Sequence, residues 1–333
     1  MLVLNEQELD TAVEEIKKKN IVIFPTETVY GIGADCTDSN AVEKIFIAKG
    51  RPNNNPLIVH LASKEQIEKY AIIENDIERK LIESFMPGPF TIILKKKSNI
   101  SSFVTCGLDT VGIRIPSNEI AHKFLEKVEV GIAAPSANLS SKPSGTNVQD
   151  IINDFDGKID YIIEGGESRV GLESTVVKVI NGIPTILRPG FITKEDIESL
   201  GLPCNIGSGV LNKVDNNEKV ESPGVLYKHY APNSKCLLVY GNNKDNLLDL
   251  VKEFNTNNSV IVGSNTLKDI PCKQFINYGN SLEEIAHSIF TILRSVDKYE
   301  PDLVIIEGVE KKGLGLAIMN RLLRSVSFNY IEK

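Results

Sequence analysis

Two cations lie close together in a segment rich in turn-forming residues, Lys49-Gly50-Arg51-Pro52-Asn53-Asn54-Asn55-Pro56. Lys49 and Arg51 are two residues apart, and the glycine and prolines beside them favour a backbone that can turn both side chains to one side. Such a pair can bind a phosphate group, although basic pairs in solvated surface loops are common. We predict a basic loop between an amphipathic helix over residues 41–48 and a strand over residues 56–61.

A third cation lies inside an apolar strand pattern, Thr110-Val111-Gly112-Ile113-Arg114-Ile115-Pro116. Strand alternation places the valine and both isoleucines on one face, and Gly112 and Arg114 on the other. A buried, unpaired arginine would be strongly destabilising, so this side chain must meet an anion or lie at an exposed edge. A structural ion pair and a bidentate contact with a ligand carboxylate both satisfy this requirement.

Polar residues follow or end several further strand patterns. A strand over residues 21–24 leads into two threonines and a carboxylate, and a small-residue segment over 130–141 could let a ligand approach the backbone closely. A lone strand histidine, such as His60, is more often packed than catalytic. Because open α/β sheets usually bind ligands at strand ends, we expect one site at the mouth of a twisted sheet. The polar positions are Thr26, Glu27, Thr28, His60, Ser136, Asn138, Ser174 and Arg188.

Length and composition limit the class of protein. A chain of 333 residues is long enough for two domains. The five cysteines are widely spaced and the four histidines form no metal-binding pair, so neither a disulfide framework nor a protein-bound metal is predicted. No apolar run is long enough for a membrane helix, and we expect a cytoplasmic protein. The net charge of −7 disfavours broad nucleic-acid binding.

The remaining patterns alternate between helix and strand. Helices are predicted over residues 9–20, 65–85 and 119–127, and strands over 90–94, 176–180 and 185–188. The tail forms its own α/β pattern, with strands over 236–240, 259–262 and 303–306 and helices over 244–254, 281–298 and from 314 onward. Its Gly313-Leu314-Gly315 segment is not a complete dinucleotide fingerprint, and a tight strand–helix turn explains it.

Seven motifs, in order within the first 190 residues, resemble those of the YrdC-like threonylcarbamoyl-AMP synthases. A further segment, 222–232 (Ser-Pro-Gly-Val-Leu-Tyr-Lys-His-Tyr-Ala-Pro), resembles the linker of the long form of that family. The seven motifs are residues 25–33, Lys49-Gly50-Arg51-Pro52, Pro87-Gly88-Pro89-Phe90-Thr91, Gly112-Ile113-Arg114-Ile115-Pro116, Ala134-Pro135-Ser136-Ala137-Asn138, Ser174-Thr175-Val176-Val177 and Leu187-Arg188-Pro189-Gly190.

The resemblance implies an α/β fold, with a YrdC-like twisted mixed sheet and helices plus a smaller Rossmann-like C-terminal domain. It implies a catalytic domain over 1–211, a linker or lid over 212–234, and a second domain over 235–333. Because the linker is polar but contains aromatic residues, we expect it to fold as a lid that excludes water from a labile adenylate.

The resemblance also implies an activity. L-threonine, bicarbonate or CO2, and ATP would give threonylcarbamoyl-adenylate and pyrophosphate for threonylcarbamoyladenosine in tRNA. Lys49 and Arg51 would be catalytic beside the leaving pyrophosphate, with Mg2+ accompanying ATP. The threonine contacts implied are Thr28, His60, Arg114, Ala134 and Ser174; the ATP contacts implied are Arg51, Asn55, Thr110, Ser136, Ser144, Arg188 and Tyr230.

Two other classes of function remain open from sequence. An RNA-binding module could use the basic loop, but the chain is acidic and lacks an aromatic–basic stripe, so tRNA binding is weakly supported. A carbamoyl-transfer enzyme could use carbamoyl phosphate, but that substrate would not need the carboxylate contact of Arg114. The expected partners are L-threonine, ATP, bicarbonate and the proteins that transfer the threonylcarbamoyl group to tRNA, with no membrane.

Overall fold

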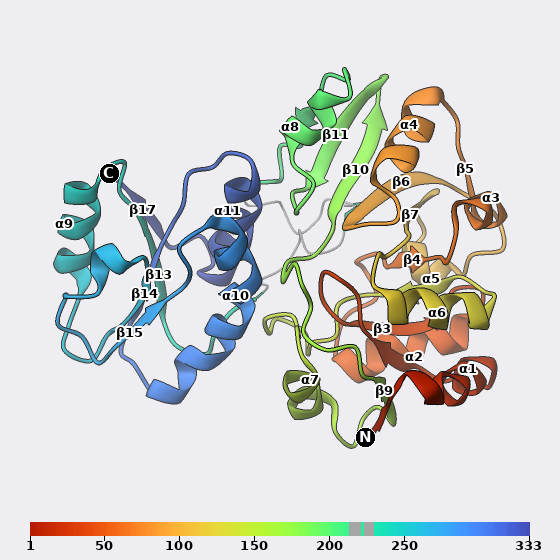
Figure 1. Cartoon of the computed structure of the whole chain (residues 1–333), viewed down its shortest axis with the longest axis horizontal. Helices are drawn as coiled ribbons and strands as arrows, with labels where there is room; N and C mark the ends of the chain where they lie inside the picture. Colours follow the sequence, from red (N-terminus) through yellow and green to blue (C-terminus); the bar gives the residue numbers. More distant parts are fainter. Residues whose placement is uncertain (213–220, 223–229) are drawn as a thin grey trace. The chain divides into compact units, whose positions relative to one another are not determined.

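The computed structural model describes residues 1–212, 221–222 and 230–333 (Figure 1). They form two compact units. The first contains residues 1–140 and the described residues from 144 to 222, and the second contains residues 141–143 and 230–333. Most of the predicted lid, residues 213–220 and 223–229, lies outside the described residues.

The first unit is built on one mixed sheet. Among the described residues its strands follow the order β1-β9-β2-β3-β8-β4-β7-β6-β10-β11-β12, and β5 pairs with β6. The fold-class prediction is confirmed by this sheet and by the second unit described below. The strands are β1 (Leu2–Leu4), β2 (Val22–Phe24), β3 (Gly31–Asp35), β4 (Ile58–His60), β5 (Ala71–Ile72), β6 (Phe90–Lys96), β7 (Thr110–Arg114), β8 (Ile132–Ala134), β9 (Tyr161–Ile163), β10 (Thr175–Ile180), β11 (Ile183–Arg188) and β12 (Asn205–Ile206).

Helices cover both faces of this sheet to different extents. Leu9 and Phe124, from α1 and α6, pack with Phe24 and Ala134 against one face. A larger apolar cluster, which includes residues of α2 and α4, packs against the other face. The helices are α1 (Leu9–Lys17), α2 (Ser39–Lys49), α3 (Ile67–Tyr70), α4 (Asp76–Phe85), α5 (Ser102–Thr105), α6 (Glu119–Val128), α7 (Val148–Phe155) and α8 (Lys194–Ser199).

The basic segment is not wholly a loop, which corrects the sequence prediction. The Asp38 carboxylate accepts a hydrogen bond from the backbone of Ala41 and begins α2, and the helix ends at Gly50 with φ of 59°. Lys49 therefore belongs to the last helical turn and is buried, whereas Arg51 lies in the loop beyond it. The glycine separates the two cations into different environments.

The single helix predicted over residues 65–85 is also wrong. The segment forms a 3-10 turn and the short helix α3, then strand β5 on the edge of β6, and only then α4. Asn75 has an extended backbone and its side chain accepts a hydrogen bond from Glu78, so it begins a new helix. The apolar spacing alone did not reveal this interruption.

The second unit has a parallel five-stranded sheet in the order β15-β14-β16-β13-β17. Helix α9 lies on one side of this sheet, and α10 and α11 lie on the other (Figure 1). Strands β15 and β17 were not predicted from sequence. The elements are β13 (Cys236–Tyr240), α9 (Lys244–Phe254), β14 (Val260–Gly263), β15 (Gln274–Asn277), α10 (Leu282–Ser295), β16 (Val304–Glu307), α11 (Leu314–Ser325) and β17 (Tyr330–Glu332). In the described part of the chain, no helix combines the length and apolarity needed to span a membrane.

Candidate functional site

The strand register places many of the predicted site residues on one face of the first sheet. His60 of β4 pairs with Arg114 of β7 and with Ile132 of β8, and Ile58 pairs with Ala134. Directly paired residues point to the same side of a sheet. Ala134, His60 and Arg114 therefore share the face on which α1 and α6 pack, and each is the last residue of its strand.

Gly112 stands at a crowded position of this face, where a side chain would not fit without rearrangement. A Cβ atom at this position would lie 3.2 Å from Cγ2 of Thr91 and 3.3 Å from Cγ1 of Ile58. Contacts this short would force the neighbouring side chains to move. Thr91 and Ile58 therefore pack directly over Gly112, two residues before Arg114 on the same side of β7.

Arg114 meets the buried carboxylate of Glu27, a partner that was not predicted from sequence. Its Nη2 lies 2.8 Å from Oε1 of Glu27, and each side chain is only 4% exposed. The two atoms are close but poorly aligned, and neither they nor Arg114 Nε has a hydrogen-bond partner in the described residues. The ion pair therefore balances charge and still leaves buried guanidinium donors that could bind a second anion.

His60 is buried and uncharged. Its ring packs edge-on against Phe24 with centroids 5.5 Å apart, and Nδ1 lies 3.1 Å from the Ile58 carbonyl oxygen. Burial, and then the positive charge of Arg114, lower the pKa of His60 to about 3. His60 can offer a neutral hydrogen-bonding group but no charge to a ligand at neutral pH.

This depressed pKa predicts a pH-dependent stability. Below about pH 6.5 the unfolded chain binds a proton at His60 that the folded chain excludes, so stability present above that pH is lost as the pH falls toward 3. Between pH 7 and pH 5, wild type should lose about 2 kcal/mol more unfolding free energy than His60→Gln. Urea unfolding of both proteins across this range tests the prediction. If the unfolding free energies of the two proteins change with pH in parallel, His60 is not held neutral by burial.

Ser174 and Arg188 form one buried hydrogen-bonded group with Thr91. The Ser174 hydroxyl lies 2.7 Å from the Thr91 hydroxyl. Arg188 donates from Nε and Nη2 to the Ser174 carbonyl oxygen, at 3.1 and 3.0 Å, and from Nη2 to Oγ at 3.1 Å. Because Thr91 borders Gly112, this group lies beside the part of β7 that carries Arg114.

Lys49 connects helix α2 to the small-residue segment. Its ammonium group donates to the carbonyl oxygens of Ser136 and Asn138, each at 2.5 Å. The Ser136 hydroxyl in turn donates to Asn138 Oδ1 at 2.6 Å. Lys49 thereby holds the loop that carries Ser136, and Ser136 pairs as a bridge with Gly31 at the start of β3.

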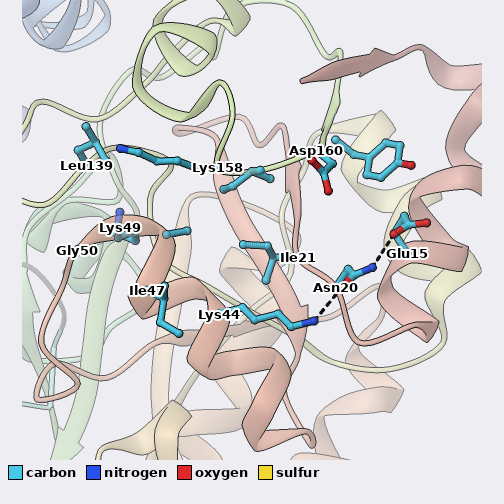
Figure 2. Close-up of a pocket in the computed structure, with 13 residues that line it drawn as sticks. Glu15, Asn20, Ile21, Lys44, Ile47, Lys49, Gly50, Leu139, Lys158 and Asp160 are labelled. Carbon is cyan, nitrogen blue, oxygen red and sulfur yellow. Dashed lines mark hydrogen bonds between the residues drawn. The ribbon is translucent and has the colours of Figure 1, made fainter.

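Lys49 also lies on the wall of a cavity of about 570 Å³, shown in Figure 2. Ile21, Ile47 and Leu139 contribute apolar lining, and Lys44 donates to Asn20 at its edge. Lys49 is the one residue of the predicted site that lines this cavity. The cavity is therefore not the place where the predicted residues converge.

Arg51 and Asn55 lie together in the loop after α2. Arg51 Nη2 donates to the Asn55 carbonyl oxygen at 2.8 Å, and its guanidinium lies over the Phe46 ring at 5.9 Å. The Asn55 side chain is fully buried, yet within the described residues neither Oδ1 nor Nδ2 has a hydrogen-bond partner. A buried amide without partners is costly, which suits a group that a polar ligand satisfies.

Asn55→Leu should therefore separate stability from binding. Removing an unsatisfied amide should leave the ligand-free melting temperature unchanged or higher, whereas the rise in melting temperature caused by ATP should fall by more than half. Asn53→Leu, at an exposed position of the same loop, is the matched control. A destabilised Asn55→Leu that keeps the full ATP effect would show that the amide is structural.

The other predicted residues have identified neighbours. Ser144 is fully buried and donates to Glu173 at 2.6 Å. The Thr28 hydroxyl lies 2.8 Å from the Thr26 hydroxyl. The Thr110 hydroxyl donates to Glu221 at 2.8 Å.

Tyr230 belongs to the second unit. There its ring stacks on Phe290 of α10, with centroids 4.9 Å apart, and the Arg321 guanidinium lies 5.9 Å from its centre. Its backbone has φ of 63°, a conformation that few non-glycine residues adopt. The structure therefore groups Tyr230 with α10 and α11, and its contact with ATP stays a prediction.

Three partners were not assigned from sequence: Glu27, Thr91 and Glu173. Each lies within or beside one of the seven sequence motifs, but its role depends on a residue distant in the chain. For Glu27 a signal existed, because a buried arginine requires a nearby anion. The other two became evident only from the hydrogen bonds that Thr91 makes with Ser174 and Ser144 with Glu173.

Comparison with known proteins identifies the domains. A Sua5/YciO/YrdC family model, described as "Telomere recombination", matches residues 14–190. A second model, described as "Threonylcarbamoyl-AMP synthase, C-terminal domain", matches residues 192–327. The chain therefore combines a Sua5/YciO/YrdC domain with the C-terminal domain of the threonylcarbamoyl-AMP synthases.

Full-length relatives lead to the same class. The chain is 41% identical to the threonylcarbamoyl-AMP synthase of Pyrococcus abyssi, over 99% of this chain and 97% of the relative, and 39% identical to that of Bacillus subtilis, over 98% and 95%. The chain also resembles a crystal structure of P. abyssi Sua5 complexed with L-threonine. The alignment covers 100% of each chain, with a TM-score of 0.94 and 39% identity. The chain belongs to the threonylcarbamoyl-AMP synthase family, and it is an enzyme of the nucleotidyltransferase kind.

Proposed function

We propose that this chain forms L-threonylcarbamoyl-adenylate and pyrophosphate from L-threonine, bicarbonate or CO2, and ATP, for the threonylcarbamoyladenosine modification of tRNA. Family membership supports the reaction, and a relative has been solved with L-threonine. The observation that carries the site assignment is the buried Arg114 guanidinium, whose Nε and Nη2 donors have no aligned acceptor in the described residues.

On the threonine side, Arg114 binds the substrate carboxylate through these two donors. Glu27 keeps the arginine in place and offsets part of its charge. Ala134 adds only a methyl group to the sheet face, and neutral His60 and the Ser174 hydroxyl offer hydrogen bonds to the ligand without adding charge. Thr28, which follows β2, completes the proposed threonine contacts.

On the ATP side, Arg51 and the Asn55 amide form one part of the site. Ser136, on the loop held by Lys49, forms another, and the buried Ser144 hydroxyl with its partner Glu173 forms a third. Arg188 orients Ser174 between the two substrates. The proposed ATP contacts are Arg51, Asn55, Thr110, Ser136, Ser144, Arg188 and Tyr230.

In the proposed reaction, an oxygen of the N-carboxylated threonine attacks the α-phosphorus of ATP and the bond to the β-phosphate breaks. Lys49 and Arg51 stabilise the charge that develops on the leaving pyrophosphate. In the described residues no three His, Cys, Asp or Glu side chains converge as metal ligands. Mg2+ bound to ATP would supply further charge neutralisation.

The product is a mixed anhydride that water can hydrolyse, so it must pass rapidly to the proteins that transfer its threonylcarbamoyl group to tRNA. We place the enzyme in the cytoplasm, where ATP and tRNA are available. A direct contact with tRNA is not part of the proposal, because the chain is acidic overall.

Pyrophosphate release by the purified full-length chain tests this proposal. Release should require ATP, bicarbonate and L-threonine together, and replacing L-threonine with D-threonine should abolish it. If pyrophosphate is released equally fast without threonine, the activity is only ATP hydrolysis and the proposed reaction is wrong.

A further inference from the structure

Glu221 is a carboxylate from a distant part of the chain that contacts the first sheet. Its Oε1 accepts a hydrogen bond from the Thr110 hydroxyl at 2.8 Å. Lys178 of β10 donates to both carboxylate oxygens at 2.7 Å. Glu221 is thus bound by a hydroxyl of β7 and an ammonium group of β10.

The sheet register places both donors on the face that carries Arg114. Lys178 pairs with Ile93 of β6, and Ile93 pairs with Gly112 of β7. Thr110 lies two residues before Gly112, and Arg114 lies two residues after it, so all three face the same side. Lys178 and Thr110 therefore form a small anion-binding subsite on the same face as the proposed threonine site.

We propose that Glu221 is an internal competitor for the phosphate groups of ATP, and that Lys178 becomes a phosphate contact when the nucleotide displaces it. This inference rests on the proposed function, in which Thr110 contacts ATP. One hydroxyl and one ammonium group cannot bind a carboxylate and a phosphate in the same position. Binding of the triphosphate therefore requires Glu221 to leave.

The contacts suit an exchangeable ligand. The side chains of Lys178 and Glu221 are 29% and 26% exposed, so water screens their attraction. A partly exposed pair of this kind is weak, and a ligand with several negative charges can replace the carboxylate. A fully buried pair such as Arg114 and Glu27 would not exchange in this way.

Glu221→Gln removes the competing charge and keeps the side-chain shape. By calorimetry on the full-length chain, it should bind ATP and inorganic tripolyphosphate about two- to five-fold more tightly than wild type, in line with the strength of an exposed ion pair. Adenosine and L-threonine should bind with unchanged affinity, because neither carries a phosphate. Added salt should reduce the gain.

Two further variants make the result specific. Lys178→Met should weaken ATP and tripolyphosphate binding, because the cation is lost while Glu221 remains. Glu198→Gln removes the same charge from an exposed pair with Lys194 and should change neither affinity. Circular dichroism of each variant confirms that the fold is retained.

The outcomes separate this inference from the proposed function. Tighter phosphate binding by Glu221→Gln, with the weakening in Lys178→Met, supports the competition. If wild type binds ATP and Glu221→Gln binds it equally or more weakly, Glu221 is a structural or productive contact and the inference is wrong. If wild type binds neither ATP nor tripolyphosphate, the proposed function fails and this inference fails with it.

Discussion

Lys49→Ala should lower the turnover number by about 100- to 1000-fold, the loss typical of removing one group that stabilises charge in a transition state. Two contributions lead to this expectation. The ammonium group is proposed to neutralise charge on the leaving pyrophosphate, and it also holds the Ser136 and Asn138 carbonyl oxygens in place. Steady-state pyrophosphate release at saturating ATP and threonine measures the effect.

The matched control is Lys158→Ala. Lys158 lines the same cavity as Lys49, but it is exposed and is not part of the proposed site (Figure 2). Its turnover should equal that of wild type. If Lys49→Ala keeps the wild-type melting temperature and the wild-type turnover number, Lys49 has no catalytic role.

Arg114→Lys should raise the KM for L-threonine by about 10- to 100-fold, with a much smaller change in the KM for ATP. A lysine retains the positive charge that Glu27 requires, but it cannot make two parallel hydrogen bonds to a carboxylate. The loss of charge-assisted hydrogen bonds, each about 1.5–3 kcal/mol, sets the size of the effect. Full KM and kcat measurements for both substrates test it.

Lysine is a better replacement here than a neutral residue. Arg114→Gln would leave the buried Glu27 carboxylate without its counter-ion, at a cost of about 3–5 kcal/mol in folding stability. Loss of activity in that variant would not identify a ligand contact. Equal increases in the two KM values for Arg114→Lys would instead indicate that Arg114 serves only the fold.

Local patterns predicted much of the fold. The alternation around Arg114 correctly separated the apolar face of β7 from the face carrying Gly112, and the spacing of apolar residues located α1, α6 and α9. These features depend on residues a few positions apart, which a sequence displays directly. The side-chain caps at Asp38 and Asn118, which begin α2 and α6, were not predicted.

Features set by distant residues were missed or misjudged. The partner of Arg114 is Glu27, 87 positions away, and the pairing of Lys49 with the carbonyl oxygens of Ser136 and Asn138 joins segments almost 90 positions apart. Short strands β15 and β17 depend on neighbours in the parallel sheet for their hydrogen bonds. Strand order and register decide these contacts, and neither follows from local apolar spacing.

Formation of one doubly labelled product tests the central claim most directly. The full-length chain would be incubated with ATP, [14C]bicarbonate and [3H]L-threonine, and the nucleotides would be separated by chromatography. The proposed reaction predicts a single adenylate that contains both labels in equal amounts, formed with one pyrophosphate per molecule. An adenylate that carries threonine but no bicarbonate-derived carbon, or the absence of any threonine-containing adenylate, would contradict it.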